Sequence, residues 1–256
     1  MRLRLYNEWL LTEDQRDRFD VVLVSPRNPL NIGAVARAMA NFGFARLKVV
    51  APYAPHWHEA KSAVGAEQLL ATAIEKATLA EAIGECTLVV GTGTLTYRKP
   101  EQTVVRLPDL APMVRQEMEH GGRVALVFGP EKHGLTRQDL SYCHLLVEIP
   151  TGAKQPSMNL GQAVAVCLYE LATRALAVDE PAAETAMRAR AATAGRLELL
   201  AGVVERAMVA ADYSPATMRE ANRHDLRLLL RRLAPSERDV RRILGLFRRI
   251  LWRLER

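Results

Sequence analysis

The hydrophobic positions between residues 20 and 177 form short β-branched runs that alternate with stretches of helical period. The runs are VVLV at Val21, LKVV at Leu47, TLVVG at Thr87, VALVF at Val124 and LLVEI at Leu145. Continuous apolar runs of this kind are typical of strands buried on both faces. Their alternation with helical patterns predicts an α/β fold, a parallel sheet with helices on both faces. Ligand-binding groups are then expected at the carboxyl ends of the strands. One helix is predicted over 32–42, closed by Gly43 as its C′ residue.

Beyond residue 195 the pattern is helical only, and it predicts a small three-helix bundle. The first helix carries Leu197, Leu200, Ala201, Val204 and Met208, and a turn follows at 213–215. The second helix is predicted to begin near Asn222, with Asp225 as its capping partner and a stripe of Leu226, Leu229, Leu230 and Leu233. The third begins at Ser236, with Asp239 in the capping-box position. Opposite its apolar stripe lie Arg238, Arg241, Arg242, Arg248, Arg249 and Arg253.

These patterns divide the 256 residues into four parts. We predict an N-terminal extension (1–19), an α/β domain (20–178), an alanine-rich linker (179–195) and a basic helical domain (196–256). No segment approaches the roughly 20 apolar residues that a membrane span needs. The N-terminus also lacks the apolar run of a signal peptide. We therefore expect a cytoplasmic protein with no membrane partner.

Charge is distributed unevenly along the chain. Residues 1–181 hold 19 Lys+Arg against 20 Asp+Glu, whereas residues 182–256 hold 16 against 9, and all sixteen cations are arginine. Arginine pairs bidentately with phosphate and stacks on bases. An arginine-only module beside a near-neutral one predicts an anionic polymer as partner. The alternative is that these arginines form only a solvated helix face, in a chain where arginine is the default basic residue.

The three cysteines do not indicate a metal centre. Cys86, Cys143 and Cys167 are widely spaced and odd in number, which fits neither a disulfide framework nor a zinc cluster. We expect buried, reduced thiols. Cys143 and His144 are adjacent, but no further ligands follow at metal spacing, so no metal is predicted.

Three separate segments each join a strand-like run to a polar loop and a helical pattern. They are VVLVSPRNPLNIGAVARAM (21–39), LVFGPEKHGL (126–135) and VEIPTGAKQPSMNLGQAVAV (147–166). In this order they resemble the three motifs of the SpoU/TrmH family, the ribose 2′-O-methyltransferases of the SPOUT class. The resemblance spans about residues 20–177. It implies S-adenosyl-L-methionine as cofactor and RNA as substrate.

The resemblance also implies catalytic residues. In the first motif Asn31, Gly33 and Arg37 match Asn-x-Gly-x-x-x-Arg. The family proposal makes the arginine a base, but a pKa above 12 favours an electrostatic role toward the target phosphate and the forming alkoxide. A helix-surface salt bridge is the alternative for Arg37. In the second motif Glu131 matches the family glutamate, and it is expected to bond substrate or orient Arg37, or else to be a plain loop carboxylate. His133 is expected to face solvent.

In the third motif Ser157, Asn159 and Leu160 match Ser-x-Asn-Leu, although either polar residue alone could be an N-cap. Donors and acceptors on Ser157 and Asn159 would surround the transferring methyl and the ribose. The cofactor pocket implied by the resemblance is formed by Thr92, Gly93, Thr94, Gly129, Ile149, Pro156, Ser157, Met158 and Leu160. The GTGT sequence at 91–94 does not fit GxGxxG, which disfavours a dinucleotide fold.

Further expectations come from the resemblance alone. It implies a trefoil knot over 124–177 and a homodimer in which Arg37 reaches across from the partner. An arginine-rich helical extension is most similar to the branch that methylates nucleotide 32 of the tRNA anticodon loop. Arg241, Arg242, Arg248 and Arg249 are then candidate RNA-binding residues. The alternatives are a ribosomal RNA substrate and a non-catalytic RNA-binding protein with an inactive SPOUT domain.

Overall fold

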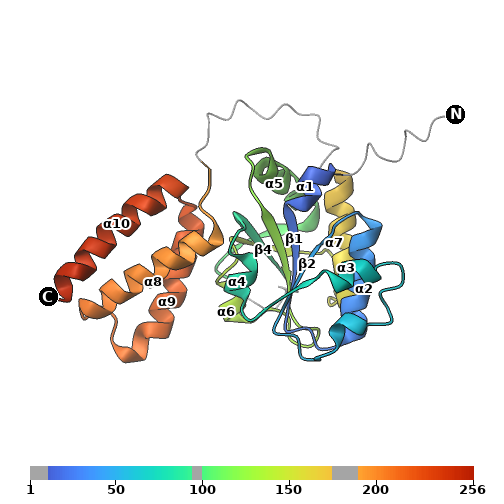
Figure 1. Ribbon diagram of the computed structural model, residues 1–256, viewed down its shortest axis with the longest axis horizontal. Helices are drawn as coiled ribbons and strands as arrows, with labels where there is room; N and C mark the ends of the chain where they lie inside the picture. The colour runs from blue at the N-terminus through green and yellow to red at the C-terminus, as the bar shows by residue number, and fades with distance from the viewer. Residues whose placement is uncertain (1–10, 94–99, 175–189) are drawn as a thin grey trace.

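A seven-stranded parallel sheet forms the centre of the larger domain (Figure 1). The structure is a computed structural model and describes residues 11–93, 100–174 and 190–256. The strand order is β3-β2-β1-β6-β4-β7-β5, and all six pairings are parallel. The strands are β1 (Phe19–Val24), β2 (Arg46–Val50), β3 (Ile74–Lys76), β4 (Leu88–Thr92), β5 (Thr103–Arg106), β6 (Val124–Phe128) and β7 (Leu145–Glu148). All five predicted runs are strands, and β3 and β5 at the two edges were not predicted.

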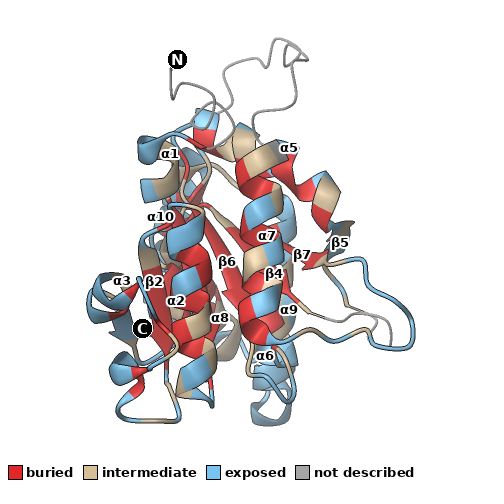
Figure 2. Ribbon diagram, turned by 90° about the vertical axis from the view of Figure 1, so that its right-hand side faces the viewer, coloured by how far each residue is buried: buried red, intermediate tan, exposed pale blue. Residues whose placement is uncertain are grey.

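Helices cover both faces of the sheet, which confirms the predicted fold class. On one face α2 (Pro29–Asn41), α3 (Glu67–Ala71), α5 (Leu107–Glu119) and α7 (Leu160–Arg174) cover the larger apolar core (Figure 2). On the other face α4 (Leu79–Ile83) and α6 (Arg137–Leu140) pack on a second core. Alternate residues of β1 divide between the two, with Val21 and Leu23 in the first and Val22 and Val24 in the second. Two short helices, α1 (Glu13–Asp17) and η2 (Trp57–Glu59), complete the domain.

Helix α2 begins three residues earlier than the sequence predicted. Asn28 caps it by accepting the N–H of Leu30 at 3.0 Å, and Pro29 occupies the first turn. Proline suits this place because its fixed φ is helical and it lacks an N–H that would have no partner. The predicted end is confirmed, because the last helical residue is Asn41 and Gly43 follows with φ +74. Asn31 therefore lies inside the first turn of α2.

A buried charge cluster lies at the amino-terminal end of the central strands. Asp20 on β1 is fully buried and accepts hydrogen bonds from Arg46 Nε at 2.6 Å and Lys48 Nζ at 2.8 Å. Burial would raise the pKa of Asp20, but Lys48 and Arg46 outweigh it and hold that pKa below its usual value. The cluster ties β1 to β2 at the end of the sheet opposite the strand carboxyl ends.

The C-terminal residues form the predicted three-helix bundle. Its helices are α8 (Ala194–Ala210), α9 (Arg219–Leu233) and α10 (Glu237–Leu254), with η3 (Ala216–Met218) before α9. Helix α8 begins two residues before the predicted domain start at 196. The capping box of Ser236 and Asp239 is confirmed.

The predicted start of the second bundle helix was wrong. Helix α9 begins at Arg219, directly after η3, and no side chain caps it. Asn222 therefore lies inside the helix, where its Nδ2 donates to Ser214 Oγ at 2.9 Å. The predicted leucine stripe is also only partly buried, since Leu230 is in the bundle core whereas Leu233 is 63% exposed.

The bundle packs on the larger domain. The first N–H groups of α8 donate to that domain, Ala194 N to Cys86 O at 2.7 Å and Gly195 N to Gly84 O at 3.0 Å. A side chain at position 195 would press on the Gly84 carbonyl, so this approach requires glycine. Arg231 of α9 is buried and donates to the Tyr142 carbonyl at 3.1 Å. Helices in the described ranges include none that is long and apolar enough to cross a membrane. The trefoil knot stays a prediction.

Candidate active site

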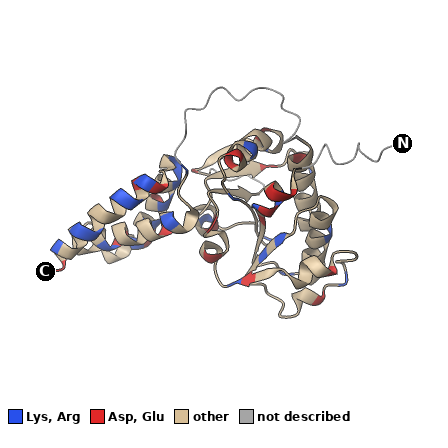
Figure 3. Cartoon of the chain, turned by 45° about the horizontal axis from the view of Figure 1, so that its top comes forward, with Lys and Arg blue, Asp and Glu red and all other residues tan. Residues whose placement is uncertain are grey.

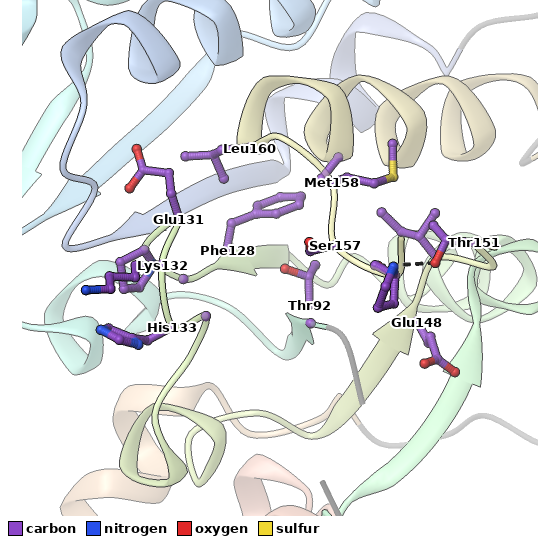
Figure 4. A pocket seen from close by; sticks show the side chains of 17 residues that line it. Thr92, Phe128, Glu131, Lys132, His133, Glu148, Thr151, Ser157, Met158 and Leu160 are labelled. Atoms are coloured by element: carbon purple, nitrogen blue, oxygen red, sulfur yellow. Dashed lines mark hydrogen bonds between the residues drawn. The ribbon is translucent and has the colours of Figure 1, made fainter. Parts of the chain in front are cut away.

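A pocket of about 280 Å³ opens at the carboxyl ends of β4, β6 and β7. The loops that follow these strands form its walls, as expected for a parallel sheet (Figure 4). Eight predicted cofactor residues line it: Thr92, Gly93, Gly129, Ile149, Pro156, Ser157, Met158 and Leu160. Thr94 lies outside the described residues. The three loops that carry the sequence motifs thus converge on one cavity.

The walls combine an apolar interior with a polar rim. Phe128, Ile149, Met158 and Leu160 supply the apolar surface, and Thr151 and Glu148 stand at the rim (Figure 4). The Thr151 hydroxyl donates to the Pro156 carbonyl at 3.1 Å, which ties the two ends of this loop together. Thr92 uses its hydroxyl on the Val127 carbonyl at 2.9 Å, so it contributes little polarity to the pocket.

Several lining residues were missed from the sequence. Phe128 and Glu148 end the strand runs VALVF and LLVEI, where a ligand-facing side chain is expected in a parallel sheet. That signal was available. Lys132, Thr151 and Ala163 also line the pocket, and nothing in their local sequence marks them.

Gly129 is required by the loop itself. A Cβ at this position would collide with the backbone of Gly134 and with the N–H of Leu135. Gly134 has φ +63, a conformation that favours glycine. The two glycines therefore allow 129–135 to fold into a tight turn.

A hydrogen-bond network at the rim joins the three motifs. Asn31 Nδ2 donates to Glu131 Oε1 at 2.8 Å, and Asn159 Nδ2 donates to Asn31 Oδ1 at 3.0 Å. Glu131 also accepts the backbone N–H groups of Arg27 at 3.1 Å and Asn28 at 3.2 Å. One residue from each motif loop is thereby fixed relative to the other two.

The environment of Glu131 keeps its carboxylate ionised. Partial burial acts to raise its pKa, but the hydrogen bonds from Asn31 and from backbone N–H groups outweigh burial and lower the pKa below its usual value. Within one chain the oxygens of Glu131 accept from the start of α2 and from Asn31. That Glu131 orients an Arg37 contributed by a second subunit stays a prediction. Glu131 is a positioning residue for the first motif.

Asn159 is an N-cap, one of the two possibilities that the sequence left open, and it also bonds another motif residue. Its Oδ1 accepts the N–H of Gly161 at 2.9 Å, so it caps α7, while its Nδ2 is bonded to Asn31. Ser157 lies in the pocket wall with an exposed side chain. His133 is exposed as predicted and lies on the same loop as Glu131.

Arg37 lies apart from the pocket of its own chain. It is exposed in the middle of α2 and is absent from the pocket lining. Six residues along a helix separate it from Asn31 by about 9 Å of rise and turn it to another face. Asn31 and Arg37 therefore do not meet at one end of α2.

The cysteines are free and buried, as predicted. Burial raises the pKa of Cys143 to about 12. Burial also lowers the pKa of His144 to about 3, and its Nδ1 accepts the Val89 N–H at 3.0 Å. Among the described residues, Glu101, His224 and Asp225 are the group with clustered metal-ligating atoms, and Glu101 already pairs with Arg137 at 2.9 Å.

The sheet topology and a pocket built from three motif loops define an α/β RNA methyltransferase of the SPOUT type. The model of the SpoU rRNA Methylase family matches residues 18–169, and the chain belongs to this family. The predicted family and enzyme class are thus confirmed.

Named relatives refine the comparison. The tRNA (cytidine/uridine/adenosine-2′-O-)-methyltransferase TrmJ of Pseudomonas aeruginosa is 37% identical over 201 residues, 75% of this chain and 78% of that protein. The tRNA (cytidine-2′-O-)-methyltransferase TrmJ of Methanocaldococcus jannaschii is 39% identical over 159 residues, 60% of this chain and 67% of that protein. The crystal structure of TrmJ from Z. mobilis ZM4 superposes with a TM-score of 0.78 at 27% identity, covering 90% of this chain and 98% of that chain. That coverage extends past residue 169, so the likeness includes the helical bundle.

The pocket fits the predicted cofactor, S-adenosyl-L-methionine, which agrees with membership of a methylase family. Adenosine needs an apolar slot with a few polar groups, and Phe128, Ile149 and Met158 provide such walls. The rim hydroxyls and Glu148 can bond the polar parts of the molecule. Residues of the motif loops and of the strand ends would hold the cofactor.

Proposed function

We propose that this protein methylates the ribose 2′-hydroxyl of tRNA, at nucleotide 32 of the anticodon loop, with S-adenosyl-L-methionine as donor. The observation that carries the proposal is the network of Asn31, Glu131 and Asn159 beside the pocket. It supports a site that fixes the RNA-facing side chains of three motifs around one cofactor. The names of the two relatives, both tRNA 2′-O-methyltransferases, support the substrate.

Positioning is the main task of the residues in the pocket. When bound, the cofactor supplies an electrophilic methyl group, and transfer needs the 2′-oxygen in line with it at about 3 Å. The loop at 149–158 and Phe128 hold the adenosine, and Ser157 and Asn31 hydrogen-bond the ribose. Glu131 is not the base, since three N–H groups already occupy its oxygens and its lowered pKa makes it a weak proton acceptor.

Arg37 stabilises the alkoxide that forms on the 2′-oxygen. A guanidinium remains protonated at any working pH, so it cannot accept the hydroxyl proton. It lowers the free energy of the anion instead, and the proton leaves to water. Within the described part of the chain Arg37 has no hydrogen-bond or ion-pair partner, which leaves it available to an RNA phosphate.

A second copy of this chain brings Arg37 to the site. The exposed side of α2 and α7 carries apolar residues beside Arg37: Leu30 is 54%, Val166 38% and Tyr169 55% exposed. An apolar surface of this kind favours association, and the two helices already pack closely, with a Cβ at Gly161 only 2.8 Å from Ala34 Cβ. A homodimer through this surface would make each site from two subunits.

The arginines of α10 bind the RNA backbone. Arg223, Arg227 and Arg231 of α9 pair with Glu205 or Glu198. In contrast, six arginines of α10 are exposed, and no ion pair joins any of them to a carboxylate among the described residues: Arg238, Arg241, Arg242, Arg248, Arg249 and Arg253. Figure 3 shows the Lys and Arg positions in blue along the helix that ends at the C-terminus. Unpaired exposed guanidinium groups on one helix face suit an array of phosphates. We call these six residues the arginine face.

Two alternatives are kept. The family description names rRNA, so a ribosomal RNA substrate would use the same chemistry. A non-catalytic RNA-binding protein is the other, and the complete set of Asn31, Glu131, Ser157 and Asn159 argues against it.

Mass spectrometry of reaction products separates these possibilities. Purified protein is incubated with S-adenosyl-L-methionine and either unmodified tRNA or ribosomal RNA fragments, and nuclease digests are searched for 2′-O-methyl nucleosides. We expect one methyl group at tRNA nucleotide 32, lost when that nucleotide carries 2′-deoxyribose. Methylation of ribosomal RNA alone would contradict the tRNA proposal, and cofactor binding without any product would support the non-catalytic alternative.

A further inference from the structure

The arginine face of α10 has an exposed tryptophan near its C-terminal end. Trp252 is 38% exposed. Arg248 and Arg249 precede it by four and three residues, so all three side chains are neighbours on one side of the helix. The acidic residues of α10, Glu237 and Asp239, are confined to its first turn. The neighbours of the indole on this side of the helix are thus mainly arginines, and one carboxylate, Glu255 at the C-cap, follows three residues later.

Two guanidinium groups contact the indole. Arg249 Cζ lies 4.1 Å and Arg256 Cζ 3.8 Å from the ring centroid. These are cation–π distances, and a guanidinium over a ring orients the ring and stiffens it. The contacts do not bury Trp252, and the bundle core is complete without it. Trp252 is therefore not one of the buried side chains that form the bundle core.

We propose that Trp252 stacks on an unpaired nucleobase of the RNA that the arginine face holds. The proposal rests on the RNA-binding role of this face. Single-stranded nucleic acid is bound by cationic grooves with interspersed aromatic side chains, because every base has a π-face. A base in a duplex is already stacked and cannot use the indole, so the occupant is a loop or a single-stranded end. A base that displaces one guanidinium from the ring leaves that arginine free for the neighbouring phosphate, and base stacking is the stronger of the two contacts.

Binding of labelled RNA to the full-length protein tests this. The probes are tRNA, an unstructured RNA oligonucleotide and a blunt RNA duplex, each titrated over a range of salt concentrations. Trp252→Ala is expected to weaken binding of the oligonucleotide about 5- to 150-fold, the range for loss of one stacked base. The slope of log affinity against log salt should not change, because no phosphate contact is removed. Duplex affinity should stay within two-fold, and Trp252→Phe should restore most of the oligonucleotide affinity.

A matched control lies on the same helix. Leu246 is 59% exposed at the border of the arginine face, and Leu246→Ala should leave all three affinities unchanged. Arg241, Arg242, Arg248 and Arg249 replaced together by Gln should instead reduce the salt slope for tRNA and duplex alike. Each contact removed lowers the slope by about 0.7 to 0.9.

Fluorescence gives a readout that keeps Trp252 in place. In a Trp9→Phe background only Trp57, which is fully buried, and Trp252 remain. The oligonucleotide should quench the emission of Trp252, and the Trp252→Phe variant should show no quenching.

Three results would overturn the proposal. The first is an unchanged oligonucleotide affinity in Trp252→Ala, and the second is an equal loss of affinity for oligonucleotide and duplex. The third is a Trp252→Ala variant that no longer binds phosphatidylglycerol vesicles but binds RNA as the wild type does. The last would assign Trp252 to a membrane surface. Failure of the proposed methylation appears separately, as absence of a 2′-O-methyl nucleoside from a protein whose Trp252-dependent RNA binding is normal.

Discussion

Replacing Glu131 by Gln tests whether the network at the pocket rim organises the site. Glu131 Oε1 accepts from Asn31 Nδ2 and Asn28 N, and Oε2 accepts from Arg27 N. Glutamine has the same shape but only one acceptor oxygen. If that oxygen still accepts from Asn31 and Asn28, the new NH₂ group points at the Arg27 N–H. Both groups are donors, so no hydrogen bond forms between them. One hydrogen bond is lost and two lose their charge assistance.

The magnitude follows from these three bonds. A net hydrogen bond contributes about 0.5 to 1.5 kcal/mol, and somewhat more when an ion takes part. Glu131 is exposed to solvent, which keeps its contribution toward the lower end. We expect Glu131→Gln to cost about 1 to 2 kcal/mol in transition-state positioning, which is a loss of roughly 5- to 30-fold in kcat/KM. Glu131→Ala removes all three bonds and should cost more.

Methyl transfer from labelled S-adenosyl-L-methionine to tRNA measures the effect. The matched control is Glu59→Gln, an exposed carboxylate in η2 with no hydrogen-bond partner among the described residues. The control should behave as wild type. Coupling is measured with Asn159→Ala, alone and combined with Glu131→Gln. Since Asn31 links the two residues, the losses in the double variant should be less than additive.

The pH dependence separates positioning from proton transfer. The folded-state pKa of Glu131 is lowered, so its stabilising charge is present above the usual value near 4.5 and is lost as pH falls through the lower folded pKa. Between about pH 6 and 9 the loss in Glu131→Gln should therefore be constant. Wild-type activity in the Gln variant would refute the argument. A loss above about 1,000-fold that grows with pH would instead make Glu131 the general base.

Three further substitutions test other parts of the structure. Arg37→Ala should lower kcat at least about 100-fold, the loss that follows removal of a donor to a developing oxyanion. Its cofactor affinity should stay within a few-fold of wild type, and Arg37→Lys should restore little activity. Near-normal single-turnover transfer in Arg37→Ala would exclude this role. Gly129→Ala forces a Cβ into the backbone of Gly134, so calorimetry should show at least about ten-fold weaker cofactor binding, whereas Gly152→Ala, where the Cβ meets open space, should bind normally. Asp20→Asn leaves Lys48 buried without its counter-charge and should cost about 3 to 5 kcal/mol, a fall of roughly 6 to 20 °C in Tm. A Tm change below about 2 °C would contradict that reasoning, and Lys48→Met should recover stability in the double variant.

The central strands were predictable because they are buried on both faces. A strand in that position must be apolar throughout, and this gives a continuous run. The edge strands β3 and β5 have three or four residues and are largely exposed, so no such run marks them. The start of α9 was mispredicted because Asn222 and Asp225 resemble a cap, and only the preceding η3 turn shows that the helix has already begun.

The motif residues were found from the sequence, but their mutual contacts were not. Glu131 is 100 positions from Asn31, and Asn159 is 128. Their meeting depends on strand register: β1 pairs with β6 so that Leu23 is level with Phe128, and the loops that follow leave the sheet side by side. Register is set by packing of the whole sheet, which no local pattern contains. Sequence reasoning therefore did not identify Asn31 and the first N–H groups of α2 as the partners of Glu131.

The arginines counted in residues 182–256 have two different roles in the structure. Arg231 is buried, and it donates to Glu198 Oε1 at 3.2 Å and to the Tyr142 carbonyl, so it fastens the bundle to the larger domain. Removing residues 190–256 would uncover Cys86 and Ile83 and leave the carbonyls of Gly84 and Cys86 without the α8 N–H groups. Loss of activity in such a truncation would mix RNA binding with damage to the domain. Substitutions confined to the arginine face avoid this, because its side chains are exposed and no hydrogen bond or ion pair joins them to the larger domain's described residues.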